Sequence, residues 1–513
     1  MDYLLGIDIG TSGTKALLIN ASADGEVVAS ATRTYPLYTP KPLWAEQEPE
    51  DWWQATIAAV ADVIREAGVD SKDIKGVGLS GQMHGSVFLD EDNEVIRPAI
   101  LWCDQRTQAE CDWIMDTVGR DRVVDLISNP VLTGFTAGKI IWLRNNEPEL
   151  YAQVRRVLLP KDYIRFRLTG EFATEVSDAS GTALFNVRKR DWAYEMLDAI
   201  RIPREWMPRA YESPEVSGRV SAEAASVTGL VEGTAVVGGG GDQAAGAVGN
   251  GVVEPGIISS TVGTSGVVFA FAEKPVVDPE LRVHTFCHAV PDKWHVMGVM
   301  LSAGGSLRWY RDTFGESEAA VARAVGRDTY DIMSEEAAKV VAGCEGLLFL
   351  PYLAGERTPY PDANARGVFF GITLRSNRAH MVRSVLEGVA YGLRDSFGIL
   401  EEMGVPILQV RASGGGARSD VWRQIQADVT GRDHVTINVD EGPALGVALL
   451  AGVGTGIYPD VETACRSVIS ITSITKANSA AKAVYDRYYE VYRSLYQSLK
   501  DEFAAVSRIV AGS

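Results

Sequence analysis

Cysteine is scarce in this chain of 513 residues. The cysteines are few, odd in number and scattered along the sequence: Cys103, Cys111, Cys287, Cys344 and Cys465. Domains stabilised by disulfides carry many cysteines at regular spacings. This usage therefore excludes a disulfide framework and indicates a reducing compartment.

Basic residues and long apolar runs are also in short supply. The chain has 49 Lys and Arg against 67 Asp and Glu, a formal net charge of −18, which excludes a nucleic-acid-binding or anionic-membrane surface. The most apolar long stretch, "GPALGVALLAGVGTGIYP" at 442–459, predicts a buried helix and a turn because its glycines and length do not suit a membrane span. The N-terminus enters a strand at once, which leaves no room for a signal peptide. We expect a cytoplasmic protein with neither a nucleic-acid nor a membrane partner.

The chain instead has the composition and alternating pattern of a large α/β protein. Its length exceeds that of one ordinary core. Apolar strand-like segments open the sequence ("YLLGID", "TKALLIN", "EVVASATRTY"), and a helix is expected from Pro49 to Gly68, followed by the strand "IKGVGLS". A stretch of turn-forming residues near 252 divides the chain. We expect two similar α/β domains, residues 1–252 and 253–513, with a ligand cleft between them.

The tetrapeptide GTSG occurs twice, at 10–13 and again at 263–266, half a chain apart. Both copies lie between apolar, β-branched segments, so each predicts a strand–turn–strand unit. A glycine turn offers backbone N–H groups and hydroxyls to an anion. One such turn is usually only a turn, but one in each half predicts a clamp on a shared polyphosphate.

Two acidic residues follow strands at positions suited to phosphate chemistry. Asp242 comes after four glycines in "TAVVGGGGDQAAGAVGNG", at the start of a helix of small residues. A helix N-cap is the alternative explanation for Asp242, but four glycines exceed what a cap needs, so a catalytic role is favoured. Asp8 ends the first strand just before the first turn, where a Mg²⁺ ion would fit between the carboxylate and a phosphate.

A polar cluster in the first half suits a polyol. The segments "GLSGQMHG" and "LWCDQR" supply an amide, an imidazole, an indole, a carboxylate and a guanidinium, from Gln82, His84, Trp102, Asp104 and Arg106. A single histidine after a strand is usually structural. The combination favours a sugar pocket, because hydroxyls need paired donors and acceptors.

The sequence resembles the FGGY family of carbohydrate kinases, within the actin-like superfamily of ribonuclease-H-fold ATPases. The resemblance rests on "WAEQEPEDWW", "SGQMHG", "LWCDQR", "LLPKDYIRFRLTGEFATEVSDASGT", "GGGGDQAAGAVG", "TVGTSG", "PYLAGERTPYPD", "GVFFGITLRSNRAHMVRSVLEGVAYGLRD" and "GGGARSDVWRQIQADVTG". It covers nearly the whole chain. "GQMHG" together with "PYLAGERTP" is similar to members that phosphorylate D-xylulose rather than glycerol.

The resemblance implies roles for matching residues. Asp242 matches the general base that accepts the proton of the attacking sugar hydroxyl, and Asp8 matches the acid that faces Mg²⁺. Met83 and His84 match the sugar-binding pair, with Gln243 beside the base where relatives often have Asn. The residues matching the two phosphate loops and the nucleotide wall are Thr11, Ser12, Gly13, Lys15, Gly263, Thr264, Ser265, Gly304, Trp309, Gly415 and Gly416.

The resemblance implies an ATP- and Mg²⁺-dependent kinase forming D-xylulose 5-phosphate, and similar proteins suggest a homodimer. One alternative keeps the chemistry and changes the acceptor to ribulose, another ketose or a polyol. Another alternative, a non-catalytic actin-like nucleotide switch, would keep the phosphate turns but would have no need for Asp242 together with His84 and Asp104.

Overall fold

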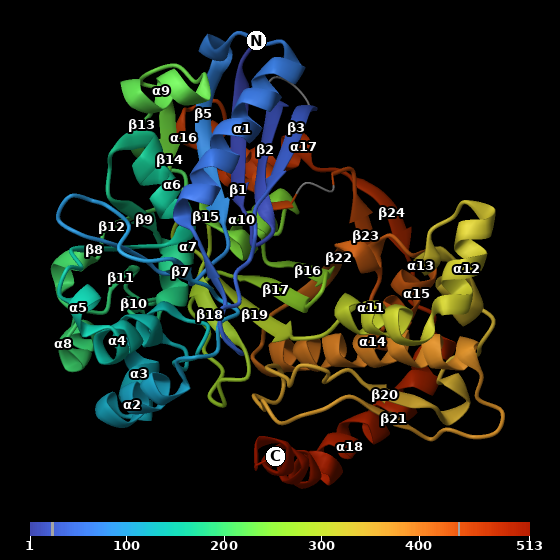
Figure 1. Ribbon diagram of the computed structural model, residues 1–513. Helices are drawn as coiled ribbons and strands as arrows, with labels where there is room; N and C mark the ends of the chain where they lie inside the picture. Colours follow the sequence, from blue (N-terminus) through green and yellow to red (C-terminus); the bar gives the residue numbers. More distant parts are fainter. Residues whose placement is uncertain (22–24, 440–441, 513) are drawn as a thin grey trace.

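A computed structural model describes residues 1–21, 25–439 and 442–512, which form two lobes (Figure 1). The N-terminal lobe is built on a sheet in the order β13-β14-β5-β1-β2-β3, with the short strand β15 added beside β5. The bounds of these strands are β1 (Tyr3–Ile9), β2 (Gly13–Asn20), β3 (Val27–Thr34), β5 (Ile74–Gly81), β13 (Val216–Arg219), β14 (Ala235–Val237) and β15 (Gly240–Gly241). The three strands predicted at the N-terminus are therefore confirmed.

The C-terminal lobe is built on a second sheet, in the order β18-β19-β17-β16-β22-β23-β24. Its strands are β16 (Gly256–Val262), β17 (Gly266–Ala272), β18 (His284–Cys287), β19 (Trp294–Met300), β22 (Ile407–Ser413), β23 (His434–Ile437) and β24 (Ile471–Thr475). The strand–turn–strand unit predicted around the second GTSG is confirmed as β16–β17.

The two sheets share one topology. In the first, β1, β2 and β3 form an antiparallel meander, β5 lies parallel to β1, and β14 lies parallel to β5. In the second, β16, β17 and β19 repeat the meander, and β22 and β23 repeat the parallel pair. This duplicated order is the ribonuclease-H-like arrangement of an actin-like ATPase, and it explains why the GTSG turn occurs twice.

Helices cover both sheets and fill out the lobes. The N-terminal lobe carries α1 (Pro49–Ala67), α2 (Gln108–Val118), α3 (Arg120–Ile127), α4 (Thr136–Asn146), α5 (Pro148–Tyr151), α6 (Pro160–Thr169), α7 (Val176–Ala179), α8 (Tyr194–Ile200), α9 (Ala222–Thr228) and α10 (Asp242–Gly249). Helix α1 starts and stops as predicted, because Pro49 occupies its first turn and Gly68 ends it with a φ of 63°.

The C-terminal half supplies α11 (Gly304–Phe314), α12 (Glu316–Val325), α13 (Thr329–Ala337), α14 (Arg378–Glu402), α15 (Asp420–Thr430), α16 (Gly442–Gly454), α17 (Val461–Val468) and α18 (Ser479–Gly512). Helix α18 docks through a buried aromatic stripe that includes Tyr485, Tyr492 and Phe503. Among the described residues, no helix combines the length and the apolarity that a membrane crossing requires.

Short two-stranded ribbons complete the structure. They pair β4 (Glu46–Gln47) with β7 (Ala99–Ile100), β6 (Val87–Leu89) with β8 (Arg156–Leu158), β9 (Ala173–Glu175) with β12 (Arg209–Tyr211), β10 (Phe185–Asn186) with β11 (Asp191–Trp192), and β20 (Leu348–Leu350) with β21 (Val368–Phe370).

Helix α16 crosses from the C-terminal half onto the first sheet. It packs against β5, β1 and α10, and its backbone comes so close that a Cβ on Gly78 would lie 1.9 Å from the Val447 carbonyl oxygen. The apolar stretch predicted to be a buried helix and a turn therefore forms a buried helix that comes from the second half of the chain and packs on the first lobe. The proposed division at residue 252 lies between α10 and β16, and it stays a prediction.

Candidate functional site

The register of the first sheet brings Asp8 and Asp242 to the same edge. Asp8 on β1 pairs with Ser80 on β5, and Ser80 pairs in turn with Gly240 on β15. Asp242 follows two residues later as the first residue of α10. Two acidic side chains that are 234 positions apart in sequence therefore meet where the strands end.

The glycines before Asp242 are required by packing as well as by any ligand. Gly239 has a φ of 71°, and a Cβ there would lie 1.9 Å from the carbonyl oxygen of Leu79. A Cβ on Gly241 would lie 2.9 Å from the Cγ of Met83. The glycine run thus has a structural explanation of its own. The N-cap of α10 is Gly241 rather than Asp242, so the carboxylate does not occupy the capping position.

The surroundings of the two carboxyls raise both pKa values. Burial raises the pKa of Asp242 to about 7, and the neighbouring charge of Asp8 adds to the rise, while hydrogen bonds from Gln243 oppose it. Burial likewise raises the pKa of Asp8 to about 6, opposed by the nearby Ser80 hydroxyl and by the charge of Lys15. A carboxylate whose pKa is near neutrality is well matched to general-base catalysis.

Asp8 also has the character of a partial metal ligand. Its Oδ1 atom is buried and has no hydrogen-bond partner. Within the described ranges, no group of three or more His, Cys, Asp or Glu side chains is arranged to hold a metal ion. A single carboxylate such as that of Asp8 still suits Mg²⁺, because this ion usually keeps several waters and binds through one or two carboxylates plus substrate phosphates.

His84 is held in a defined orientation at the end of the same sheet. Its backbone is left-handed, with a φ of 69°, and its Nδ1 lies 2.7 Å from the carbonyl oxygen of Gly181. Because a carbonyl can only accept, Nδ1 carries the proton and Nε2 keeps a lone pair. Burial, with the charge of Lys139, lowers the pKa of His84 well below its usual value. The neutral ring stacks on Phe135 at a centroid distance of 4.7 Å.

The neighbours of His84 complete one wall of the site. Met83 is buried beneath it and contacts the glycine run before the carboxylate. Lys139, which the sequence analysis missed, donates from Nζ to the carbonyl oxygens of His84 and Gly134, both at 2.8 Å. Buried lysines in an apolar sequence context give no local signal of such a contact.

The first GTSG turn is joined to the polar cluster through Thr11. Its Oγ1 accepts a hydrogen bond from Trp102 Nε1 at 2.9 Å and donates to Gln82 Oε1 at 3.2 Å. Gln47, another residue absent from the sequence-based candidates, donates to the Thr11 carbonyl at 2.8 Å. Ser12 is exposed at the tip of the turn. Lys15 on β2 lies opposite Asp8 on β1 in the register of the hairpin.

Asp104 lies behind this wall rather than on it. Its side chain is fully buried, its Oδ2 accepts from the Ala45 N–H at 2.7 Å, and both oxygens pair with the Arg106 guanidinium. Arg106 in turn lies over the ring of Trp44. A direct contact between Asp104 and the sugar stays a prediction; the structure places the carboxylate in a fully buried ion pair with Arg106.

A cationic side chain of the C-terminal lobe, Arg357, lies near His84. The half-buried Arg357 lies with Nη2 4.0 Å from the Cβ position of Gly134, and its charge contributes to the lowered pKa of both His84 and His284. In the sequence, Arg357 stands in "PYLAGERTPYPD", which marks the family resemblance but gives no sign that this arginine lies near His84.

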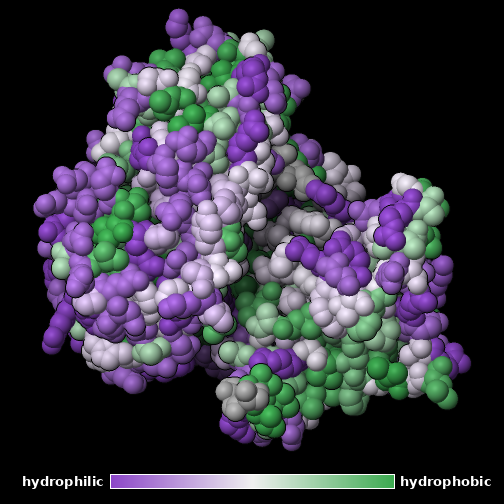
Figure 2. Space-filling model, viewed as in Figure 1, coloured by the Kyte–Doolittle hydropathy of each residue, from purple (hydrophilic) through white to green (hydrophobic). Residues whose placement is uncertain are grey.

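The second GTSG turn lines a cavity of about 590 Å³ in the C-terminal lobe, on the side of the deep hollow between the lobes in Figure 2. Of the expected nucleotide-binding residues, Gly263, Thr264, Gly304, Gly415 and Gly416 are on its lining. Arg308, Tyr330, Ser334 and Ser419 join them and were missed. The turn is fixed by Gly304 N–H, which donates to the carbonyl of Gly263 at 2.8 Å.

Trp309 and Ser265 are not part of this lining. Trp309 lies one position beyond Arg308 on α11 and packs in an aromatic cluster, stacked near Phe349 and Phe369 at centroid distances of 6.3 and 6.4 Å. That Trp309 forms part of the nucleotide wall stays a prediction, and its packing near Phe349 and Phe369 does not support it. Its position on the helix turns the ring towards the core.

Comparison with known proteins identifies the family. Models of the N-terminal and C-terminal domains of the FGGY family of carbohydrate kinases match residues 3–249 and 258–455. The chain belongs to the FGGY family of carbohydrate kinases. A xylulose kinase of Escherichia coli (strain K12) is 42% identical over 96% of this chain and 99% of its own length.

Other relatives of this FGGY kinase cover the chain equally well. A crystal structure titled as a "xyloylose kinase" from Brucella ovis is 36% identical, with a TM-score of 0.88, over 97% of this chain and 99% of its own. A gluconokinase of Bacillus subtilis (strain 168) is 33% identical over 98% of both chains. The resemblance inferred from the motifs is thereby confirmed.

Proposed function

We propose that this FGGY kinase transfers the γ-phosphoryl group of ATP to D-xylulose and forms D-xylulose 5-phosphate. The observation that carries the proposal is the Asp242 carboxylate, whose pKa is near 7 and which lies at the strand ends beside Asp8. Relatives named as xylulose kinases, similar over the full length, support the choice of sugar.

Asp242 acts on the acceptor hydroxyl. The hydroxyl oxygen attacks the γ-phosphorus, the bond from that phosphorus to the β–γ bridging oxygen breaks, and ADP leaves with the bond's electrons. The hydroxyl proton passes to Asp242. Because phosphoryl transfer asks little covalent chemistry of the protein, the remaining requirements are in-line positioning and the exclusion of water.

His84 and Met83 hold the sugar beside this base. The Nε2 lone pair of His84 accepts a hydrogen bond from a sugar hydroxyl, since Nδ1–H is committed to Gly181. Met83 supplies an apolar contact, and Gln243 hydrogen-bonds the base and borders the acceptor.

The two turns hold ATP from opposite sides. Gly263, Thr264, Gly304, Gly415 and Gly416 form the wall of the nucleotide cavity, while Thr11, Ser12, Gly13 and Lys15 approach the terminal phosphates from the first lobe. Asp8 would hold Mg²⁺ through its unpartnered Oδ1. Bound there, the ion would neutralise charge on the phosphates. The few free cysteines support a cytoplasmic location, and we retain a homodimer as the proposed assembly.

Gluconate is a second candidate acceptor. It is favoured by the half-buried, cationic Arg357 near His84 and by the gluconokinase relative. An anionic substrate would suit a guanidinium there better than a neutral ketose would.

A coupled assay of ADP release across D-xylulose, D-ribulose, gluconate and glycerol tests the choice. We expect the highest kcat/KM for D-xylulose. A tenfold preference for another acceptor, about 1.4 kcal/mol of transition-state binding, would overturn the choice of substrate and leave the kinase assignment intact.

A further inference from the structure

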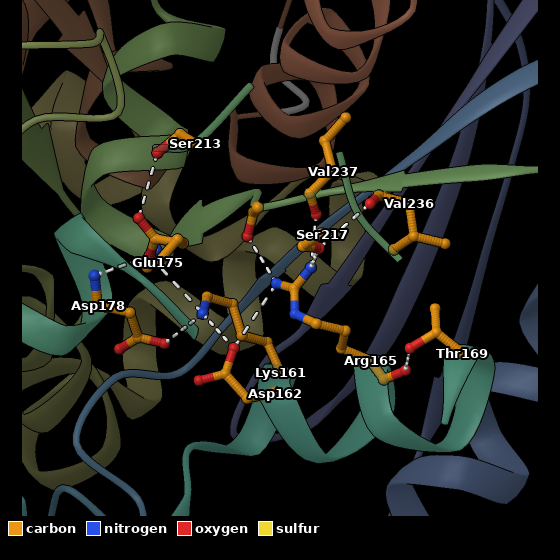
Figure 3. Close-up of polar contacts among 12 residues, drawn as sticks. Lys161, Asp162, Arg165, Thr169, Glu175, Asp178, Ser213, Ser217, Val236 and Val237 are labelled. Carbon is orange, nitrogen blue, oxygen red and sulfur yellow. Dashed lines mark hydrogen bonds and ion pairs between the residues drawn. The ribbon is translucent and has the colours of Figure 1, made fainter. Parts of the chain in front are cut away.

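A cluster of five charged side chains is buried beneath the site and has no part in the chemistry above. Lys161, Asp162 and Arg165 come from α6, Glu175 from β9 and Asp178 from α7, and all are fully buried (Figure 3). Lys161 Nζ lies 2.6 Å from Asp162, 3.2 Å from Asp178 and 3.6 Å from Glu175. These residues belong to "LLPKDYIRFRLTGEFATEVSDASGT", and the proposed reaction assigns no role to the charged residues of this segment.

The cluster is hydrogen-bonded to the backbone that directly precedes Asp242. The N–H of Gly241, the residue directly before the base, donates both to Glu175 Oε1 at 3.2 Å and to Ser177 Oγ at 3.1 Å. Arg165 donates to the carbonyl oxygens of Val237 and Gly238, each at 2.6 Å. The glycine run is therefore held at both ends, which matters because glycine has the greatest conformational freedom of any residue.

The same segment also orients the sugar-binding histidine. Six residues after Glu175, the carbonyl of Gly181 receives the Nδ1–H of His84. A Cβ on Gly181 would lie 2.4 Å from His84 Cε1, so the backbone must approach the ring directly. Residues 175–181 thus bind the peptide before Asp242 at one end and the ring of His84 at the other.

Stability alone is a poor reason to bury such a cluster. Removing charges from water is costly, and well-packed apolar side chains often replace a buried ion pair without loss of stability. A buried polar cluster that reaches the glycine run through Glu175 and Arg165 instead suits a rigid support, since reacting groups must be held to within a fraction of an ångström.

We propose that Glu175 and Ser177 are positioning residues for Asp242, acting through the shared N–H of Gly241. The inference rests on the proposed function of Asp242 as the base. Neither residue touches the substrates; their effect is on the placement of the carboxylate against the acceptor hydroxyl.

Two serines provide a matched test. Ser177 Oγ donates to Glu175 Oε1 and accepts from Gly241, whereas Ser213 Oγ donates to Glu175 Oε2 at 3.1 Å. Ser213 holds the glycine run through its backbone, because its carbonyl accepts from the Gly239 N–H at 2.8 Å, and Ser213→Ala retains this bond. We expect Ser177→Ala to lower kcat about tenfold, because small displacements of reacting groups cost up to ~10²-fold. Its KM values for D-xylulose and ATP should stay within about twofold of wild type. Ser213→Ala should lose the same thermal stability and keep its kcat.

A double-mutant cycle adds a readout that a purely structural role would not move. In an Asp242→Asn background, Ser177→Ala should have almost no further effect on single-turnover phosphoryl transfer, because the group it positions is gone. Equal kcat values for Ser177→Ala and Ser213→Ala, or a full additive loss in the double variant, would overturn the proposal. If Ser177→Ala does not fold, Glu175→Gln provides the test, since its amide can accept on one oxygen only.

The proposed base and the proposed positioning residues can be refuted separately. If Asp242→Asn itself turns over within a few-fold of wild type, the proposed base is wrong. If Asp242→Asn is inactive while the two serine variants behave alike, only the positioning role is lost.

Discussion

The two GTSG turns close similarly but have different neighbours. In the first, Gly10 N–H donates to Gly13; in the second, Gly263 N–H donates to Ser265, both at 3.0 Å. Thr11 is bound to Trp102 and Gln82 on the sugar side. Thr264 instead receives a hydrogen bond from Arg308 at 3.1 Å and borders the nucleotide cavity.

This difference supports the proposed division of labour in a duplicated fold. The shared strand order fixes where each turn lies, and the neighbouring residues outside the repeat differ. The first lobe adds Asp242 and His84 at its strand ends, whereas the second adds α11 and the glycines near 415. Substitutions in each lobe test the proposed division between an acceptor lobe and a nucleotide lobe.

The largest effect is expected for Asp242→Asn. Asn has nearly the same shape but cannot accept the hydroxyl proton, so kcat should fall by about 10²–10⁴, the usual worth of a positioned acid–base group. ATP affinity, measured by calorimetry, should be nearly unchanged because the nucleotide cavity is untouched. If ATP affinity fell by as large a factor as kcat, Asp242 would also contribute to nucleotide binding, and the proposed division between the lobes would be wrong.

A smaller effect, on ATP alone, is expected for Gly263→Ala. A Cβ there has no protein atom closer than 3.7 Å, so the fold tolerates it, but the methyl group stands where a phosphate approaches the backbone. The KM for ATP should rise about tenfold, roughly 1.4 kcal/mol, and the KM for D-xylulose should not. If Gly263→Ala affected only the sugar, the second turn would not belong to the nucleotide lobe.

His84→Asn should have the opposite selectivity. Asn tolerates the left-handed backbone and can still donate to Gly181, but it lacks the Nε2 lone pair. The KM for D-xylulose should rise about twofold to tenfold, since one neutral hydrogen bond is worth roughly 0.5–1.5 kcal/mol. Unchanged sugar kinetics in the folded variant would make His84 a structural residue only.

The smallest kinetic effect is expected for Trp309→Leu. The ring packs near Phe349 and Phe369, away from the cavity. The substitution should lower the free energy of unfolding by about 1–3 kcal/mol and leave the KM for ATP within about twofold. Denaturant unfolding and steady-state kinetics measure the two effects, and a large rise in the KM for ATP would restore Trp309 to the nucleotide wall.

Local patterns sufficed for the hairpins, for α1 and for the family, because periodicity and turn residues act over a few positions. Local patterns did not predict where α16 packs. This helix is apolar on every side, which predicts burial but does not show which sheet covers it. The adjacent residues Arg308 and Trp309 differ by about 100° around α11, and the sequence does not say which faces the cavity. Asp104 pairs with Arg106, two residues away, and nothing in that spacing distinguishes a buried ion pair from a sugar contact.

The central claim, that the first lobe supplies Asp242 as the base, is tested most directly by the pH dependence of kcat/KM for D-xylulose at saturating Mg²⁺ and ATP. The pKa of Asp242 is raised to about 7, so the carboxyl is protonated and inactive below that pH. We expect wild-type kcat/KM to fall below about pH 7, approaching tenfold per pH unit. In Asp242→Asn the fall that begins near pH 7 should be absent, and any remaining fall should begin near pH 6, where Asp8 titrates. The same acid limb near pH 7 in wild type and in Asp242→Asn would contradict the assignment of Asp242 as the base.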